Sequence, residues 1–182
     1  MAFNINEMRG QLTGGGARPN LFQVQLTNPI NRGAEEKLSF MCKTASLPAS
    51  TVSSVDVPYF GRVIKVAGQR TFADWSITII NDEDFIVRNA MEQWVNEIQL
   101  AQQNTTTRSA NPNDYKSQGQ IFQYGKEGNI LRTYQFNGVF PTEVAAIEMG
   151  WDTNDTIEEF AVTLAYDWHN VLPGATGDAG GQ

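Results

Sequence analysis

Apolar and polar residues alternate with a period of two along much of this chain. The alternation is clean at residues 22–26, 75–79 and 160–168, which is typical of strands that bury one face. The residues assigned to the buried faces are Phe22, Val24, Leu26, Trp75, Ile77, Ile79, Phe160, Val162, Leu164, Tyr166 and Trp168. We therefore expect antiparallel strands around one core, the last strand running unbroken to Trp168.

One segment, from about residue 84 to residue 102, has a helical period instead. Asn81 to Asp84 precede it with an N-cap candidate and with negative charge for the first turn. Its apolar residues recur every three or four positions, and they are Val87, Met91, Trp94, Val95, Ile98 and Ala101. This spacing predicts an amphipathic helix that covers one open face of the sheet.

Shorter strands are predicted between these elements. In the first of them Leu38, Phe40 and Cys42 share an apolar face. The shorter strands cover residues 38–42, 120–124 and 130–140. Together the patterns predict a mainly β fold with one α-helix, built as an antiparallel β-sandwich or barrel.

Residues 50–67 are rich in Val and Ser and predict an extended hairpin that turns near Tyr59-Phe60-Gly61. Its apolar residues, at positions 52, 55, 57, 63 and 66, do not keep one parity. Such a hairpin does not fit the core of its own domain, which favours contact with another subunit.

The two ends of the chain predict mobile segments around a single domain. Residues 1–16 are loop-like and finish in the glycine run 14–16, which is typical of a hinge. Residues 172–182 are too polar and too rich in glycine to bury a core. The folded domain is therefore expected at residues 17–171.

Charge is distributed unevenly over the 182 residues. The formal net charge is −7, and no Lys or Arg follows Arg132, whereas eight acidic residues do. Tight nucleic-acid binding needs clustered Lys and Arg, so an acidic third argues against a grip on phosphate. No targeting segment or membrane-spanning run of apolar residues is visible, and no contact with a membrane is expected.

Candidates for catalysis are few. The chain has one cysteine, Cys42, which fits a small buried hydrophobe, and one histidine, His169, which lies at the end of the last strand. Residues 152–157 begin like a calcium loop, but Ile157 replaces the glycine that the sharp turn needs. We expect no enzyme, no cofactor and no metal site.

A series of short blocks runs along the chain: Ala17–Val24, Cys42-Lys43, Leu47-Pro48, Val66–Gly68, Arg70–Phe72, Asp74-Trp75, Asn81–Glu83, Tyr115-Lys116, Gln123-Tyr124, Phe140–Thr142, Trp151-Asp152 and Phe160–Asp167. These blocks, in this order, resemble the tail tube proteins of T-even-type phages. Relative to that family, residues 28–36 look like an insertion, and the part after Val171 looks like an extension.

The resemblance implies a structural subunit of a virion tail that is assembled in the host cytoplasm. Family members form hexameric rings that stack head-to-tail into a tube, and each subunit adds strands to a continuous inner β-barrel. DNA passes through the lumen during ejection without specific binding. The implied partners are other copies of the chain and the sheath, baseplate, tape measure and tail terminator proteins.

Two sets of residues are expected to serve this tube. Small or polar residues of the strands, with nearby carboxylates, are candidates for the lumen: Gln23, Gln25, Ser76, Thr78, Glu143, Glu148, Glu159 and Thr163. The hairpin is the candidate for contact between stacked rings, through Val52, Val55, Val57, Tyr59, Phe60 and Val63.

Two other functions fit the same patterns. A type VI or extracellular contractile injection system uses the same kind of tube for protein cargo. A monomeric β-sandwich that binds sugar or peptide needs an exposed aromatic platform, and Tyr59-Phe60 is the clearest one that the sequence offers.

Overall fold

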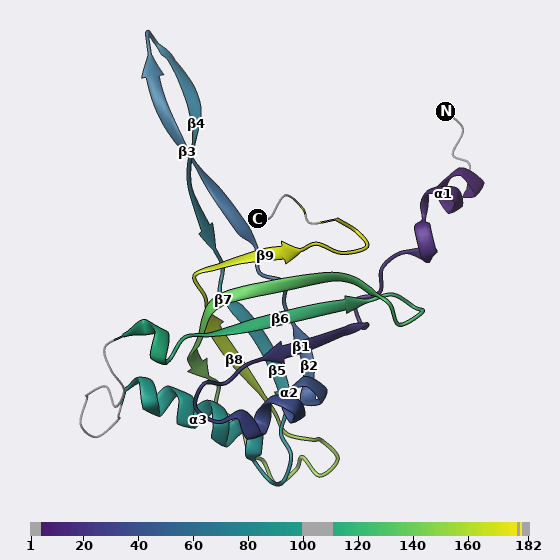
Figure 1. Cartoon of the computed structure of the whole chain (residues 1–182), viewed down its shortest axis with the longest axis vertical. Helices are drawn as coiled ribbons and strands as arrows, with labels where there is room; N and C mark the ends of the chain where they lie inside the picture. Colours follow the sequence, from purple (N-terminus) through teal and green to yellow (C-terminus); the bar gives the residue numbers. More distant parts are fainter. Residues whose placement is uncertain (1–4, 100–110, 178, 180–182) are drawn as a thin grey trace.

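Strands of the computed structural model form one bent sheet, with its longest helix at one end and a long hairpin projecting from the other (Figure 1). The structure describes residues 5–99, 111–177 and 179. The seven strands of the sheet pair antiparallel in the order β1-β6-β7-β8-β5-β2, with β9 also paired to β7. They are β1 (Phe22–Leu26), β2 (Cys42–Ala45), β5 (Trp75–Ile80), β6 (Ser117–Tyr124), β7 (Ile130–Val144), β8 (Glu159–Ala165) and β9 (Trp168–Leu172).

The long strand β7 folds this sheet into two layers. Its first part pairs with β6 and β9, and its last part, from Phe140, pairs with β8. Gly138 lies between the two parts with φ +71, and a Cβ atom there would stand 2.1 Å from a carboxylate oxygen of Asp167. Only glycine combines a readily adopted positive φ with the absence of a Cβ atom that would clash with Asp167, so the bend depends on this residue.

The core lies between the layers, and its residues come from the alternating runs. The Trp75 and Phe136 rings stack across it with centroids 4.4 Å apart, and Gly119 leaves room for the indole. Val24, Ile77 and many of their predicted companions are fully buried. The predicted mainly antiparallel β fold is confirmed, although the sheet of the described chain does not close into a barrel.

The described residues form three α-helices where the sequence predicted one: α1 (Ile5–Gln11), α2 (Glu35–Met41) and α3 (Ile86–Ile98). The predicted helix is α3, and it buries Val87, Met91 and Trp94 as expected. Ala101, assigned to the same stripe, lies outside the described residues. Short 3₁₀ turns occur as η1 (Thr13–Gly15), η2 (Arg32–Ala34) and η3 (Pro112–Asp114).

The predicted strand at residues 38–42 is wrong, because most of it belongs to α2. Leu38 is buried while Phe40 is 75% exposed, so the two side chains do not share a face. Tertiary contacts favour the helix: Asn28 is buried, donates to the carbonyl of Ala90, and has its backbone N–H bound by the Glu35 carboxylate. Cys42 then opens β2 and is half-buried against the core.

The predicted closing strand is two strands with a turn at Tyr166-Asp167. The Asp167 carboxylate accepts from Lys116 Nζ at 2.7 and 2.8 Å, and the Asp167 N–H donates to the carbonyl of Asn137. These bonds redirect the chain onto β7. Trp168 therefore lies on the outside, 46% exposed, and not in the core.

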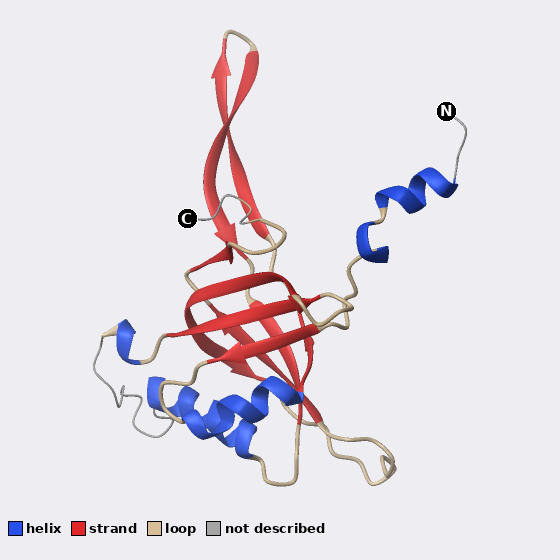
Figure 2. Ribbon diagram, turned by 45° about the vertical axis from the view of Figure 1, so that its right-hand side comes forward, coloured by secondary structure: helices blue, strands red, loops and turns tan. Residues whose placement is uncertain are grey.

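The segment before residue 17, expected to be loop-like, contains α1 and η1. Figure 2 shows α1 standing apart from the sheet, and none of its residues is buried.

Candidate assembly surfaces

A two-stranded hairpin, β3 (Ser50–Tyr59) and β4 (Arg62–Phe72), confirms the predicted hairpin and its turn. The two strands pair with each other and not with the seven-stranded sheet. Figures 1 and 2 show them extending as a twisted ribbon well beyond the two layers. No residue of either strand is buried. A lone hairpin is marginally stable in water, so this one is suited to being covered by a partner.

The strand register explains the irregular apolar parity of the hairpin. Val55 pairs with Val66, Val57 with Ile64, and cross-strand partners of an antiparallel pair share a face. Odd positions of β3 therefore join even positions of β4 in one apolar face. That face consists of Val55, Val57, Tyr59, Ile64 and Val66, and Arg62, the partner of Tyr59, lies at its end beside the turn.

The opposite face is more polar and includes the paired Asp56 and Lys65. Val52 and Val63, expected at the same contact as Val55, lie on this second face, whereas Phe60 occupies the turn and is 91% exposed. Sequence reasoning missed Ile64, because its place on the apolar face depends on the register.

Seven of the eight lumen candidates fall into two sets on the outsides of the two layers. Ser76 pairs with Thr163, and Thr163 also pairs with Glu143 across β7 and β8. Thr78 and Glu159 belong to the same outer surface, where Glu159 forms an ion pair with Lys43. The structure thus brings five of the eight candidates together on the outside of β5, β7 and β8.

Gln23 and Gln25 lie on the outside of the other layer. A row of amides crosses that layer, because Gln25 pairs with Gln120, Gln120 with Gln135, and Gln135 with Asn170. Glu148 belongs to neither set and lies in the loop between β7 and β8. Because the two sets lie on opposite outer faces of the subunit, a lumen lined by one of these faces contains only one of the two sets.

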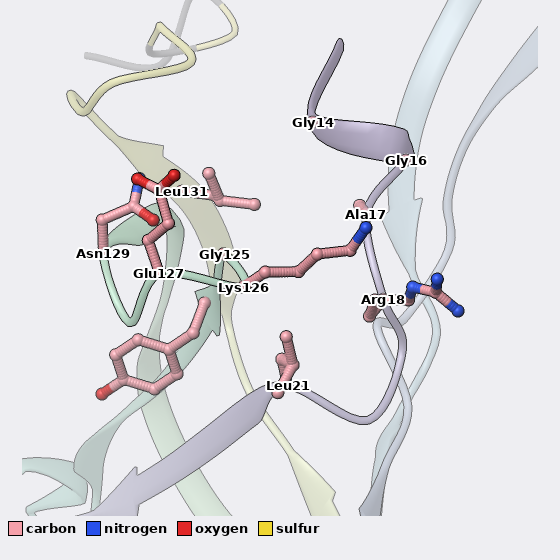
Figure 3. A pocket seen from close by; sticks show the side chains of 11 residues that line it. Gly14, Gly16, Ala17, Arg18, Leu21, Gly125, Lys126, Glu127, Asn129 and Leu131 are labelled. Atoms are coloured by element: carbon pink, nitrogen blue, oxygen red, sulfur yellow. The ribbon is translucent and has the colours of Figure 1, made fainter. Parts of the chain in front are cut away.

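A pocket of about 280 Å³ lies between the segment before β1 and the turn that joins β6 to β7 (Figure 3). Arg18, Lys126 and Glu127 supply its charges, and no histidine or cysteine lines it. Across the described residues, no group of three or more His, Cys, Asp or Glu side chains is placed to hold a metal.

The lone histidine and the lone cysteine both lie in packed surroundings. His169 is half-buried among the rings of Phe72, Phe136 and Tyr166, and burial, with Arg70 nearby, lowers its pKa. Burial raises the pKa of the Cys42 thiol to about 12, which keeps it protonated at neutral pH. Burial also raises the pKa of Tyr166 to about 12. Burial against aromatic or apolar neighbours is the largest cause of all three pKa shifts.

In the part of the chain that the structure describes, no helix is long and apolar enough to cross a membrane.

Solved structures share the fold of this chain. A chain in the sheath/tube terminator of an extracellular contractile injection system (PVC) has a TM-score of 0.65 at 17% identity, covering 86% of this chain and 96% of that one. A chain in the tube-terminating cap of the anti-feeding prophage has a TM-score of 0.64 at 21% identity, covering 86% and 91%.

Sequence relatives are closer. The tail tube protein gp19 of Enterobacteria phage T4 is 36% identical over 157 residues, which are 86% of this chain and 92% of that protein. The tail tube protein of Serratia phage KSP90 is 26% identical over 167 residues, 89% of this chain and 93% of its own length. The family model described as phage tail tube protein matches residues 17–172. The chain therefore belongs to the phage tail tube protein family.

Proposed function

We propose that this protein is a structural subunit of the inner tube of a contractile phage tail and not an enzyme. Its copies form hexameric rings in the host cytoplasm, the rings stack head-to-tail, and DNA leaves through the lumen. Sheath, baseplate, tape measure and tail terminator proteins are its neighbours in the virion tail. Family membership supports this proposal, as does the similar fold of a chain in a PVC sheath-tube complex (TM-score 0.58, 20% identity).

The exposed hairpin is the observation that carries the proposal. Its apolar face stands in solvent along both strands, and an apolar patch of this length on a soluble protein marks an interaction surface. Covering it with another copy buries that face and stabilises a pair of strands that has no other support. Because this contact joins different surfaces of two copies, it repeats without closing and builds length.

The strands of the body suit closure into a ring. β2 pairs with β5 alone, and β1 pairs with β6 alone, so each has a free edge within the described chain. Pairing across subunits removes such edges. We assign the lumen to the outside of β5, β7 and β8, because Ser76, Thr78 and Thr163 are small and Glu143 repels phosphate.

The tube of an extracellular contractile injection system is the second candidate function. The fold supports it equally, since a chain of the PVC terminator has a TM-score of 0.65. Sequence favours the phage, with 36% identity to the T4 protein against 17% to the PVC chain. Capsid genes beside this one favour the phage tail, and genes for a protein toxin favour the injection system.

Aspartate substitutions in the hairpin test the proposal. Val55→Asp with Val57→Asp introduces two charges into the apolar face, so we expect soluble subunits or single rings and no tubes. Val52→Asp with Val63→Asp places the same charges on the opposite face and is the matched control, expected to form tubes. Negative-stain electron microscopy and sedimentation measure both. Normal tubes from the first variant contradict the hairpin contact.

A further inference from the structure

The loop that joins β7 to β8, residues 145–158, presents large apolar side chains to solvent. Trp151 is 98% exposed, and Met149 and Ile157 are also largely exposed. Tryptophan is among the residues most often withdrawn from water, so an almost fully exposed indole calls for a partner. The turn itself is fixed, since Thr153 bonds the carbonyl of Gly150 through both its N–H and its hydroxyl. The loop thus holds its apolar side chains outward on a defined turn.

The loop and the hairpin carry opposite charge. Residues 145–158 contain four acidic residues and no basic one, whereas residues 50–72 contain three basic residues and one acidic one. Asp152 and Asp155 of the loop, and Arg62 of the hairpin, form no ion pair within the described residues. Their charges are therefore available to a second molecule.

These two surfaces lie at opposite ends of the molecule. Figure 1 shows the hairpin turn at one end of the longest axis and the loop between β7 and β8 at the other, and Figure 2 shows the same separation. A hairpin cannot reach across the body to the loop of its own chain. In a head-to-tail repeat, by contrast, one end of each copy meets the opposite end of the next.

We propose that residues 145–158 receive the β3–β4 hairpin of a second copy of this chain, a pairing that rests on the proposed tube and names its receiving surface. Trp151 and Met149 cover the apolar face around Val57 and Ile64. Asp152 faces Arg62, which pairs with Tyr59 and so belongs to that face, at the rim, where charges set register and partner choice. The contact joins the exposed apolar side chains and carboxylates of the loop to the apolar face and basic residues of the hairpin. One copy cannot form this contact with itself, because its loop and its hairpin lie at opposite ends.

Charge reversal tests the pairing. One variant carries Arg62→Glu, a second carries Asp152→Lys, and a third carries both changes. Each single variant is expected to raise the protein concentration needed for pelleting by at least about tenfold, the effect of roughly 1.4 kcal/mol. The double variant restores opposite charge and is expected to pellet within about threefold of the wild type, roughly 0.7 kcal/mol. Glu127→Lys, on the turn between β6 and β7, is the charge control expected to pellet normally.

A second variant removes the apolar contact. Trp151→Ala is expected to keep the wild-type melting temperature, because the side chain touches little of its own domain, and to raise the pelleting concentration by about tenfold. Electron microscopy of the same samples should show single rings in place of tubes.

The outcomes separate the pairing from the tube itself. If wild type forms tubes and either single variant does so at the same concentration, the pairing is overturned and the tube stands. If both single variants fail and the double variant fails equally, the named charge pair is wrong. If wild type forms neither rings nor tubes at any concentration, also after addition of a baseplate from a contractile tail, the proposed function and the pairing fail together.

Discussion

The Trp94 indole of α3 gives the sharpest prediction about the stability of the subunit. Its side chain has 0% exposure and lies in the core between the helix and the sheet. Its Nε1–H donates to the carbonyl of Tyr115 at 2.8 Å, which ties the helix to the segment that leads into β6. Trp94→Ala removes both the packing and the hydrogen bond.

The expected loss is large. Truncating a buried aromatic to alanine costs about 3–5 kcal/mol, since the neighbours relax only partly into the space. For a domain of this size each kcal/mol lowers Tm by roughly 2–4 °C, so the variant should melt about 6–20 °C lower. Trp94→Phe keeps most of the ring but leaves the Tyr115 carbonyl unpaired, which costs about 1–3 kcal/mol.

Urea unfolding followed by circular dichroism measures these losses, at a concentration where sedimentation shows monomers. That condition matters because assembly stabilises the folded state by mass action. Exposed Trp151→Ala is the matched control and should unfold with the wild type. A Trp94→Ala midpoint equal to that of the control would refute the assignment of α3 to the core.

Three further predictions concern the body of the domain. Gly138→Ala forces a Cβ into the Asp167 carboxylate at a positive φ, so urea unfolding should show a loss of about 1–3 kcal/mol, and wild-type stability would contradict the bend. The pKa of His169 is lowered in the folded state, so below pH 6.5 the unfolded state binds a proton more readily than the folded state does. The free energy of unfolding should therefore fall as pH drops below 6.5, and His169→Gln should make it less dependent on pH in that range. Removal of residues 173–182 should change Tm little, because the described residues 173–177 are exposed; insoluble protein would show that this end is needed.

Much of the sheet follows from local pattern alone. Residues 22–26 and 75–79 alternate cleanly because one face of each strand packs into the core, and α3 keeps its stripe because that stripe is buried. The strand prediction for the α2 segment is wrong because its apolar residues both alternate and recur three apart, so the local pattern fits a strand and a helix alike. Contacts of the buried Asn28, which lies outside the segment, favour the helix. The break at Asp167 depends on Lys116, fifty-one residues away, which no local window contains.

The candidate site divides in the same way. The apolar residues of the hairpin keep no single parity in the sequence, which predicts that the hairpin does not pack into its own core. In the structure both of its strands are exposed. The apolar face is not visible, because it needs the pairing of Val57 with Ile64. Alternation likewise assigns Gln23 and Ser76 to outer faces, but only the strand order shows that these faces belong to different layers.

Negative-stain electron microscopy of the purified protein at high concentration, with sedimentation of the same sample, tests the central proposal most directly. We predict rings and hollow tubes with six-fold end views, and their loss in the Val55→Asp, Val57→Asp variant. Compact monomers at every concentration, also after addition of a baseplate from a contractile tail, would contradict the tube.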